Sequence, residues 1–516
     1  MANKALFKGT RGKLVRKSNT RNRAGGNAYA FGDKHALAQY VATGCMSQTF
    51  YADAGEQLDT VLRLTTRVDT AFIARAAIYA REKGNMKDTP ALLTAALASR
   101  DTDLMRKAFA RVVDNARMLR NFVQILRSGV TGRKSLGSAP KRLVLDWLAS
   151  RSDEQLFIGS VGNDPSLADV IKMVHPKPAN AARAALYAYM IGRPYDTDAL
   201  PQLVRDYEAF KRGETLKVPN VPFQMLTSLP LGPQDWVEIA KHAKWQMTRM
   251  NLNTFARHGV FARQNMDRVV ADRLRDPVNV KSARAFPYQL MVAWMNAGNG
   301  IPGDVLNALQ DAMEIAIENV PVVKGKVYVL VDVSGSMDWA VTGARRGATS
   351  KVRCRDVAAL FAAAMLRRNS SAEVLPFHTR VENVRLNPRD SVVTNAQVLA
   401  RLPSGGTDCS IPLRELNSRR AEGDLVIFVS DNESWVDAKR GSTAVMEQWE
   451  KFKVRSPRAK LVCVDLVPNC TTQAYERDDV LNVGGFSDQV FALVKQFADG
   501  TLGNEHWVGE IEKTEL

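Results

Sequence analysis

The sequence predicts two domains of different class: a helical N-terminal domain and a doubly wound, mostly parallel α/β domain after it. Its 516 residues are enough for two or more domains. From about residue 33 to residue 319, apolar residues recur at i, i+3, i+4 and i+7, which is the period of amphipathic helices. After Pro321, apolar strands alternate with helices, as in doubly wound sheets. We therefore expect the domain boundary near residue 320.

Residues 28–320 are predicted to form a HEAT-like α-solenoid of paired helices. Short breaks that contain Gly, Pro or Asn, such as Gly84-Asn85 and Asn299-Gly300, separate the helical segments. Many short antiparallel helices in series are typical of a solenoid, although the sequence has no strict repeat period. The clearest expected helices lie at residues 71–83, 90–99, 103–115, 141–149, 179–191, 198–211, 234–242, 287–296 and 302–318.

Residues 1–27 form a basic arm that we expect to be flexible. The arm has no acidic residue and ends in Gly25-Gly26. One interpretation of such a segment is a solvated tail, and another is an arm that binds RNA phosphates. The two interpretations are compatible. Its basic residues are Lys4, Lys8, Arg11, Lys13, Arg16, Lys17, Arg21 and Arg23.

Residues 321–516 are predicted to form the α/β domain. Strands are expected at residues 326–332, 372–377, 424–430 and 459–466. Helices at residues 351–368, 394–401, 441–453 and 487–498 alternate with them. Ligands of doubly wound sheets bind at the carboxyl ends of the strands, and Asp332 and Asp431 fall at such ends.

The most informative motif is Asp332-x-Ser334-x-Ser336, directly after the first strand. One carboxylate and two hydroxyls supply hard oxygens, which suit Mg²⁺ best, with Mn²⁺ or Ca²⁺ as alternatives. We expect Gly335 to let this loop turn tightly. A Ser/Gly-rich turn by itself often only satisfies backbone groups. Two later residues, Thr407 in a Gly-rich turn and Asp431 after another apolar strand, extend the motif to a candidate metal site.

Composition excludes several classes of protein. The sequence contains no run of about 18 apolar residues and no apolar stretch near its start, so we expect neither a membrane span nor a secretory signal. Its five cysteines are an odd number without CxxC spacing, which indicates a reducing cytoplasm and neither a disulfide framework nor a zinc site.

The net charge of +17 is unevenly divided along the sequence. Residues 1–320 contain 45 lysines and arginines against 29 acids, a balance of +16, whereas residues 321–516 contain 26 against 25, a balance of +1. A strongly basic domain joined to a near-neutral one predicts a phosphate-rich partner for the basic part, typically nucleic acid.

The three loops resemble the metal-ion-dependent adhesion site of von Willebrand factor A domains, which has DxSxS, a Thr and an Asp in this order. The resemblance implies that Ser334 and Ser336 are direct ligands and that Thr407 binds directly or through water. It implies that Asp332 and Asp431 bind the ion directly or support the residues that do. One coordination position would stay open for a partner's carboxylate or a water.

The chain as a whole resembles the TROVE family, which contains the Ro autoantigen and its bacterial relatives. The resemblance implies an RNA-binding ring whose ends are joined by the A domain. Single-stranded 3′ ends of misfolded RNAs would enter the ring, and small noncoding Y-like RNA would lie on its basic outer face. In bacteria the implied partner is a 3′-to-5′ exoribonuclease, polynucleotide phosphorylase. The stretches that carry the resemblance are residues 35–44, 49–51, 141–147, 171–178, 251–252, 286–287, 332–337 and 429–435.

The resemblance also selects candidate RNA-binding residues. His175, between Lys172 and Lys177, matches a histidine near the family's channel; alternatively, it is a helix-end residue with satisfied hydrogen bonds. Lys141 and Arg142 match a basic pair of the family, but the polar face of an amphipathic helix would look the same.

A further candidate is the loop of residues 131–137, whose Arg133, Lys134 and backbone N–H groups could contact phosphate. The loop lacks the spacing of a P-loop. In contrast to the family, residues 152–171 contain no lysine or arginine, which leaves channel contacts there without a basic residue.

These observations favour a noncatalytic RNA-binding protein. The sequence has no Ser/His/Asp order and no carboxylate pair for hydrolysis. Phosphodiester cleavage commonly uses two metals about 3.5 to 4 Å apart, and a single site with hydroxyl ligands does not provide them. The alternative is an interaction adaptor that recruits partners through the metal site, with RNA binding incidental.

Overall fold

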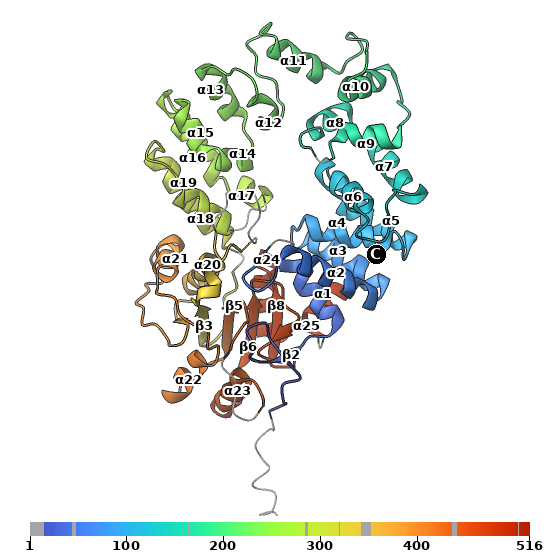
Figure 1. Ribbon diagram of the computed structural model, residues 1–516. Helices are drawn as coiled ribbons and strands as arrows, with labels where there is room; N and C mark the ends of the chain where they lie inside the picture. Colours follow the sequence, from blue (N-terminus) through green and yellow to red (C-terminus); the bar gives the residue numbers. More distant parts are fainter. Residues whose placement is uncertain are drawn as a thin grey trace, which may run out of the picture. The chain divides into compact units, whose positions relative to one another are not determined.

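The computed structural model divides the chain into two compact units (Figure 1). The described residues are 15–43, 48–163, 165–283, 287–318, 320–341, 352–435, 441–503 and 505–516. Residues 1–68 and 317–513 form one unit, which we call the sheet unit. Residues 69–316 and 514–516 form the other, which we call the helical unit. The division at residues 316 and 317 lies close to the expected boundary at residue 320, but residues 28–68, expected in the helical domain, group with the sheet.

The sheet unit is built on five parallel strands in the order β4-β3-β5-β6-β8. This order is that of a doubly wound sheet, with its switch point between β3 and β5. Four strands agree with the prediction, whereas β8 was not predicted, because its sequence Val-Leu-Asn-Val-Gly is short and contains a polar residue and a glycine. The strands are β3 (Val327–Asp332), β4 (Glu373–Phe377), β5 (Leu425–Ser430), β6 (Lys460–Asp465) and β8 (Val480–Gly484).

Helices cover both faces of this sheet. On one face, α22 (Ile411–Ser418) and α23 (Ala444–Arg455) share a core with alternate strand residues, and the rings of Trp449 and Phe452 stack 5.5 Å apart. Two further helices, α20 (Cys354–Arg368) and α24 (Asp488–Asp499), contact the strands and each other through Phe361 and Phe491, whose rings stack at 4.6 Å. Helix α21 (Val392–Ala400) packs against α20, and α25 (His506–Glu512) contacts β8.

The N-terminal part of the chain completes the sheet unit. Strands β1 (Thr20–Arg21) and β2 (Asn27–Ala30) form a hairpin, and β2 pairs with β7 (Thr471–Thr472) from the C-terminal part. Helix α1 (Asp33–Thr43) contacts β8, and α2 (Ala54–Arg67) packs on α1. The hairpin is held because Tyr29 is buried in the core of the sheet unit. Residues 15–27 of the predicted arm are thus part of this hairpin region, while Lys4, Lys8, Arg11 and Lys13 lie outside the described residues.

The helical unit contains helices throughout, as predicted. Each helix contacts others close to it in sequence, for example α3 with α4 and α5, and α16 with α19. Several begin at side-chain N-caps, among them Asp101, Asn115 and Ser166, whose oxygens accept backbone N–H groups. The predicted HEAT-like repeat and ring closure stay predictions. The described helices are α3 (Thr70–Glu82), α4 (Asp88–Leu97), α5 (Thr102–Val112), α6 (Ala116–Ser128), α7 (Ser138–Ser150), α8 (Asp153–Gly159), α9 (Leu167–Val174), α10 (Ala181–Ile191), α11 (Gln202–Lys211), α12 (Phe223–Leu226), α13 (Pro233–His242), α14 (Trp245–Met250), α15 (Leu252–Arg257), α16 (Met266–Arg275), α17 (Pro277–Ala283), α18 (Pro287–Met295) and α19 (Gly303–Ala316).

Two sequence expectations can be compared with the described residues. Among them, no helix has the length and apolar character needed to cross a membrane. Cys354, Cys409, Cys463 and Cys470 are free thiols, and the first three are buried.

Candidate metal centre and basic surfaces

The candidate metal site lies at the switch point of the sheet. Asp332 is the last residue of β3, and Asp431 directly follows β5, the neighbouring strand. Parallel strands bring these two carboxyl ends to the same edge, where ligands of doubly wound sheets bind. The five predicted ligands are all buried, with exposed fractions of 0% for Asp332, 0% for Ser334, 6% for Ser336, 4% for Thr407 and 2% for Asp431.

Hydrogen bonds join most of these side chains. The Ser334 backbone N–H donates to Asp332 Oδ1 at 2.8 Å, and the hydroxyl oxygens of Ser334 and Ser336 lie 3.3 Å apart. Ser336 and Asp431 also line the same pocket. The other Asp332 oxygen, Oδ2, accepts a 2.6 Å hydrogen bond from the Ser430 hydroxyl. The structure therefore brings Asp332, Ser334, Ser336 and Asp431 together.

The second loop, which contains Thr407, is tied to the first loop through the backbone. The Gly335 N–H donates to the Gly405 carbonyl at 2.9 Å. A Cβ on Gly405 would lie 2.4 Å from Nδ1 of the buried His378 ring, so only glycine fits there. Gly335 has no such constraint: its φ is not positive, and a Cβ would lie 3.7 Å from its nearest neighbour. The glycine that the loops require is thus Gly405, and our sequence argument for Gly335 was wrong.

The electrostatics of the site favour a cation. Burial raises the pKa of Asp332, against the opposing effect of hydrogen bonds from Ser334 and Ser430. Burial, followed by the negative charge of Asp332, raises the pKa of Asp431 well above its usual range. Two buried carboxylates that repel each other are costly unless a positive charge lies between them.

The donor set also fits a hard divalent ion. The described residues include no group of three or more His, Cys, Asp or Glu side chains arranged for a metal. A site here would therefore depend on the hydroxyl oxygens of Ser334, Ser336 and Thr407 beside the two carboxylates. Such an all-oxygen set suits Mg²⁺.

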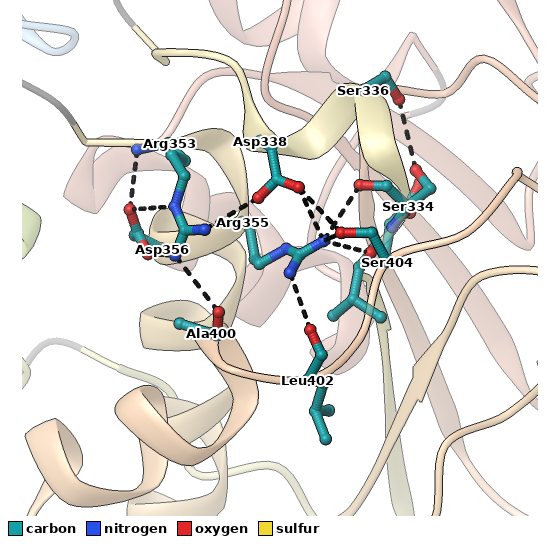
Figure 2. Close-up of polar contacts among 11 residues, drawn as sticks. Ser334, Ser336, Asp338, Arg353, Arg355, Asp356, Ala400, Leu402 and Ser404 are labelled. Carbon is teal, nitrogen blue, oxygen red and sulfur yellow. Dashed lines mark hydrogen bonds and ion pairs between the residues drawn. The ribbon is translucent and has the colours of Figure 1, made fainter.

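An arginine that the sequence analysis missed holds the loops in place (Figure 2). Arg355, in the first turn of α20, donates to the Val333 carbonyl at 2.6 Å and to the Leu402 carbonyl at 2.9 Å. Its guanidinium also contacts the side chains of Asp338, at 3.2 Å, and Ser404. Arg355 is 3% exposed, so these contacts are its main hydrogen-bond partners. It acts as a positioning residue that fastens the first loop to the second.

The predicted RNA-binding residues lie in the helical unit. Lys141 and Arg142 are in the first part of α7, Lys172 is in the last turn of α9, and α7 contacts α9. His175 is the C-cap of α9, in a left-handed conformation with φ of 53°. These four side chains and Lys177 are exposed, and none has an acidic partner within salt-bridge distance among the described residues.

The two RNA-binding candidates of the loop at residues 131–137, Arg133 and Lys134, differ in their contacts. Lys134 is exposed, whereas the Arg133 guanidinium donates to the Ala98 carbonyl at 2.7 Å, near the end of α4. It also packs over Gly137, where a Cβ would lie 2.9 Å from a guanidinium nitrogen. Arg133 therefore has a structural task that its position in the sequence did not reveal.

The net charge is divided differently when it is counted for the two structural units instead of at residue 320. By sequence, the helical unit has 34 lysines and arginines against 25 acids, a balance of +9, and the sheet unit has 37 against 29, a balance of +8. Residues 1–68, which group with the sheet, account for +7 of the latter. The basic excess thus belongs to both units.

A doubly wound parallel sheet with Asp, Ser and Thr loops at its switch point is the arrangement of a von Willebrand factor A domain, here following a helical region. Residues 326–498 match the family model "Ro60 vWA domain". The chain is 25% identical to "RNA-binding protein RO60" of Deinococcus radiodurans over 93% of this chain and 96% of that protein. It is also 22% identical to the Caenorhabditis elegans protein of the same name, over 50% of this chain and 40% of that protein.

The fold agrees with these similarities. The crystal structure of the Deinococcus radiodurans RO (RSR) protein superimposes with a TM-score of 0.63 at 22% identity, and the match covers 91% of this chain and all of that one. The chain is thus similar in sequence, over most of its length, to a protein named RNA-binding protein RO60, and its fold is similar to that of the Ro protein. The predicted fold class, a helical region followed by a von Willebrand factor A domain, is confirmed.

Proposed function

We propose that this chain is a noncatalytic RNA-binding protein. The observation that carries the proposal is its similarity, over nearly its whole length, to a protein named for RNA binding. The cations on α7 and α9 support it physically. Lys141, Arg142 and Lys177 are exposed and have no salt-bridge partner among the described residues, and Lys172 is exposed with only the charge of Asp169 acting on it. Phosphates are the natural partners of such charges.

The exposed His175 adds a planar ring with a hydrogen-bonding N–H group to this surface. A histidine beside lysines can hydrogen-bond or stack on an unpaired base, which is how single-stranded RNA is commonly held. We therefore propose two RNA ligands, small noncoding Y-like RNA and misfolded RNA with a single-stranded 3′ end. A role in RNA quality control or decay, with a 3′-to-5′ exoribonuclease such as polynucleotide phosphorylase in the cytoplasm, would follow from the family resemblance.

We also propose that the sheet unit binds one divalent cation, most simply Mg²⁺. Asp332, Ser334, Ser336, Thr407 and Asp431 would hold it, and the ion would neutralise the two buried carboxylates. Neither this site nor the cations of the helical unit provides the two-metal arrangement common in phosphodiester cleavage. In this proposal, RNA binding and metal binding are separate properties of two units.

Charge removal in the helical unit tests the RNA proposal. The variant Lys141→Ala/Arg142→Ala loses two unpaired cations, and we expect its affinity for a small structured RNA with a 3′ tail to fall by about tenfold or more. The matched control is Arg106→Ala/Lys241→Ala, which removes the same charge from exposed residues of the same unit. Arg106 pairs with Asp103 at 2.6 Å and Lys241 with Glu238 at 2.8 Å, so neither cation is available to phosphate.

Filter binding at one fixed salt concentration gives both affinities. Equal losses in the two variants would show that only net charge matters and would contradict a specific surface on α7 and α9. Unchanged affinity in both variants would place the RNA contacts elsewhere.

A further inference from the structure

A tyrosine from the N-terminal part of the chain reaches the candidate metal site. Thr49, Phe50 and Tyr51 line one pocket of the sheet unit together with Ser336 and Asp431. Tyr51 and Ser336 therefore lie on the wall of the same pocket. The space left in this pocket is about 10 Å³, enough for about one water and too small for a carboxylate group from another molecule.

Neighbouring contacts hold this segment in place. The Phe50 ring packs edge-on against Tyr51, with centroids 4.7 Å apart, and against Trp339 of the first metal loop at 6.0 Å. The Thr49 N–H donates to the Ala52 carbonyl at 2.8 Å, which closes a tight turn just before α2. The residues before and after Tyr51 in the sequence are thus held by contacts of their own.

A second N-terminal stretch covers the third metal loop. The Asn22 side-chain amide donates to the Ser434 carbonyl at 2.5 Å, and the Ala24 N–H donates to Glu433 Oε2 at 3.1 Å. Gly26 approaches so closely that a Cβ would lie 2.1 Å from the Ser434 carbonyl oxygen. Two separate stretches of the N-terminal part, residues 22–26 and 49–52, therefore lie on the loops that would bind the ion.

The chemistry of Tyr51 matches this position. A tyrosine phenol, whose ordinary pKa is about 10, keeps its proton at neutral pH. A neutral hydroxyl can hydrogen-bond to a ligand of the ion or to a water on it. Tyr51 shares its pocket with Ser336 and Asp431, two of the residues that would hold the ion.

We propose that Tyr51 closes the metal site from within the chain, so that the cation joins the N-terminal segment to the sheet and accepts no carboxylate from another molecule. This inference rests on the proposed metal site and is independent of RNA binding. It departs from the open coordination position that the adhesion-site resemblance implied. The site then links the N-terminal segment to the sheet within the sheet unit, and we call this link the joint.

The proposal can be tested with Mn²⁺ as a paramagnetic probe in the full chain. Water-proton relaxation reports whether bound Mn²⁺ has a rapidly exchanging water, and acetate serves as the carboxylate probe. For the wild type we expect low relaxivity that acetate does not change. For Tyr51→Ala we expect relaxivity about twofold higher, lowered again by acetate, because an open position is occupied first by water.

Two further variants control for packing. Tyr51→Phe keeps the ring and removes only the hydroxyl, so it should raise relaxivity without loosening the segment. Tyr195→Phe, at an exposed tyrosine of the helical unit, should behave as the wild type. In parallel, hydrogen exchange of residues 48–52 should slow by about tenfold when the wild type binds Mg²⁺.

The outcomes separate the two proposals. High, acetate-sensitive relaxivity in the wild type would overturn closure by Tyr51 while leaving the metal site intact. Unchanged hydrogen exchange of residues 48–52 on metal binding would overturn the joint. Failure of the wild type to bind Mn²⁺ or Mg²⁺ would overturn both the metal site and the joint, without consequence for RNA binding.

Discussion

Asp332 and Asp431 determine the electrostatics of the candidate metal site. Both are buried next to hydroxyl groups, burial raises the pKa of both, and the negative charge of Asp332 raises the pKa of Asp431 further. The motif around them could be read from the sequence, because DxSxS after an apolar strand is a local pattern. Tyr51 and Arg355 could not be assigned this way, because neither belongs to the motif: Tyr51 comes from the N-terminal part of the chain, and Arg355 from the helix that follows the first loop.

Replacing Asp332 tests the separation of metal and RNA binding. We expect Asp332→Ala to abolish Mg²⁺ binding in calorimetry, because it removes one of two carboxylates, while RNA affinity stays nearly unchanged. The isosteric variant Asp332→Asn should give the same result without creating a cavity. A comparable loss of RNA affinity would show that the RNA contacts involve the sheet unit.

His35 should make the stability of the sheet unit depend on pH. Burial, followed by the charge of His506, lowers the pKa of His35 to about 3. The unfolded chain takes up this proton as the pH falls below about 6.5, but the folded chain does not, so stability is present above that pH and lost below it.

Urea unfolding of the wild type and His35→Gln measures this effect. Between about pH 6.5 and pH 5, we expect the wild type to lose about 1 to 2 kcal/mol more unfolding free energy than the variant. Glu476 Oε2 lies 3.6 Å from His35 Nδ1, and burial raises the pKa of Glu476 to about 7. The folding stability that the protonated Glu476 contributes is therefore lost as the pH rises through that value. Parallel pH profiles of the two proteins would contradict a buried neutral His35.

At the scale of elements, the loops after β3, β4 and β5 are held by close approaches and by one buried arginine. Alternating apolar strands and helices predicted β3 to β6 correctly, since their periodicity is local. The loops' dependence on Gly405 follows from the packing of His378, which the sequence does not display. The hairpin of β1 and β2 was missed because a basic, Gly-rich stretch has no strand periodicity.

Two glycine variants compare these loops. We expect Gly405→Ala to lower the unfolding free energy by about 1 to 3 kcal/mol, because its Cβ would overlap the His378 ring. Gly335→Ala, where the Cβ has room, should change it by less than about 1 kcal/mol. Thermal unfolding compares the pair, and an equal cost would mean that the loops adjust more readily than the contacts indicate.

At the scale of the molecule, the N- and C-terminal parts of the chain form one unit, and the helical unit is the segment between them. The sequence predicts a boundary near residue 320, and the two units divide at residues 316 and 317. The prediction assigned residues 28–68 to the helices, because α1 and α2 have the same period as the helices that follow. The partner of α1 in the sheet, β8, lies more than 400 residues away in the sequence. This grouping also divides the positive charge between both units.

Binding of RNA through exposed cations predicts that RNA affinity depends strongly on salt concentration. The measurement is the affinity of the wild type for a small structured RNA with a free 3′ tail, across a series of salt concentrations. If about 6 phosphates are neutralised, log affinity should fall against log salt with a slope of about −4 to −5. A weak affinity with a flat salt response would contradict the account.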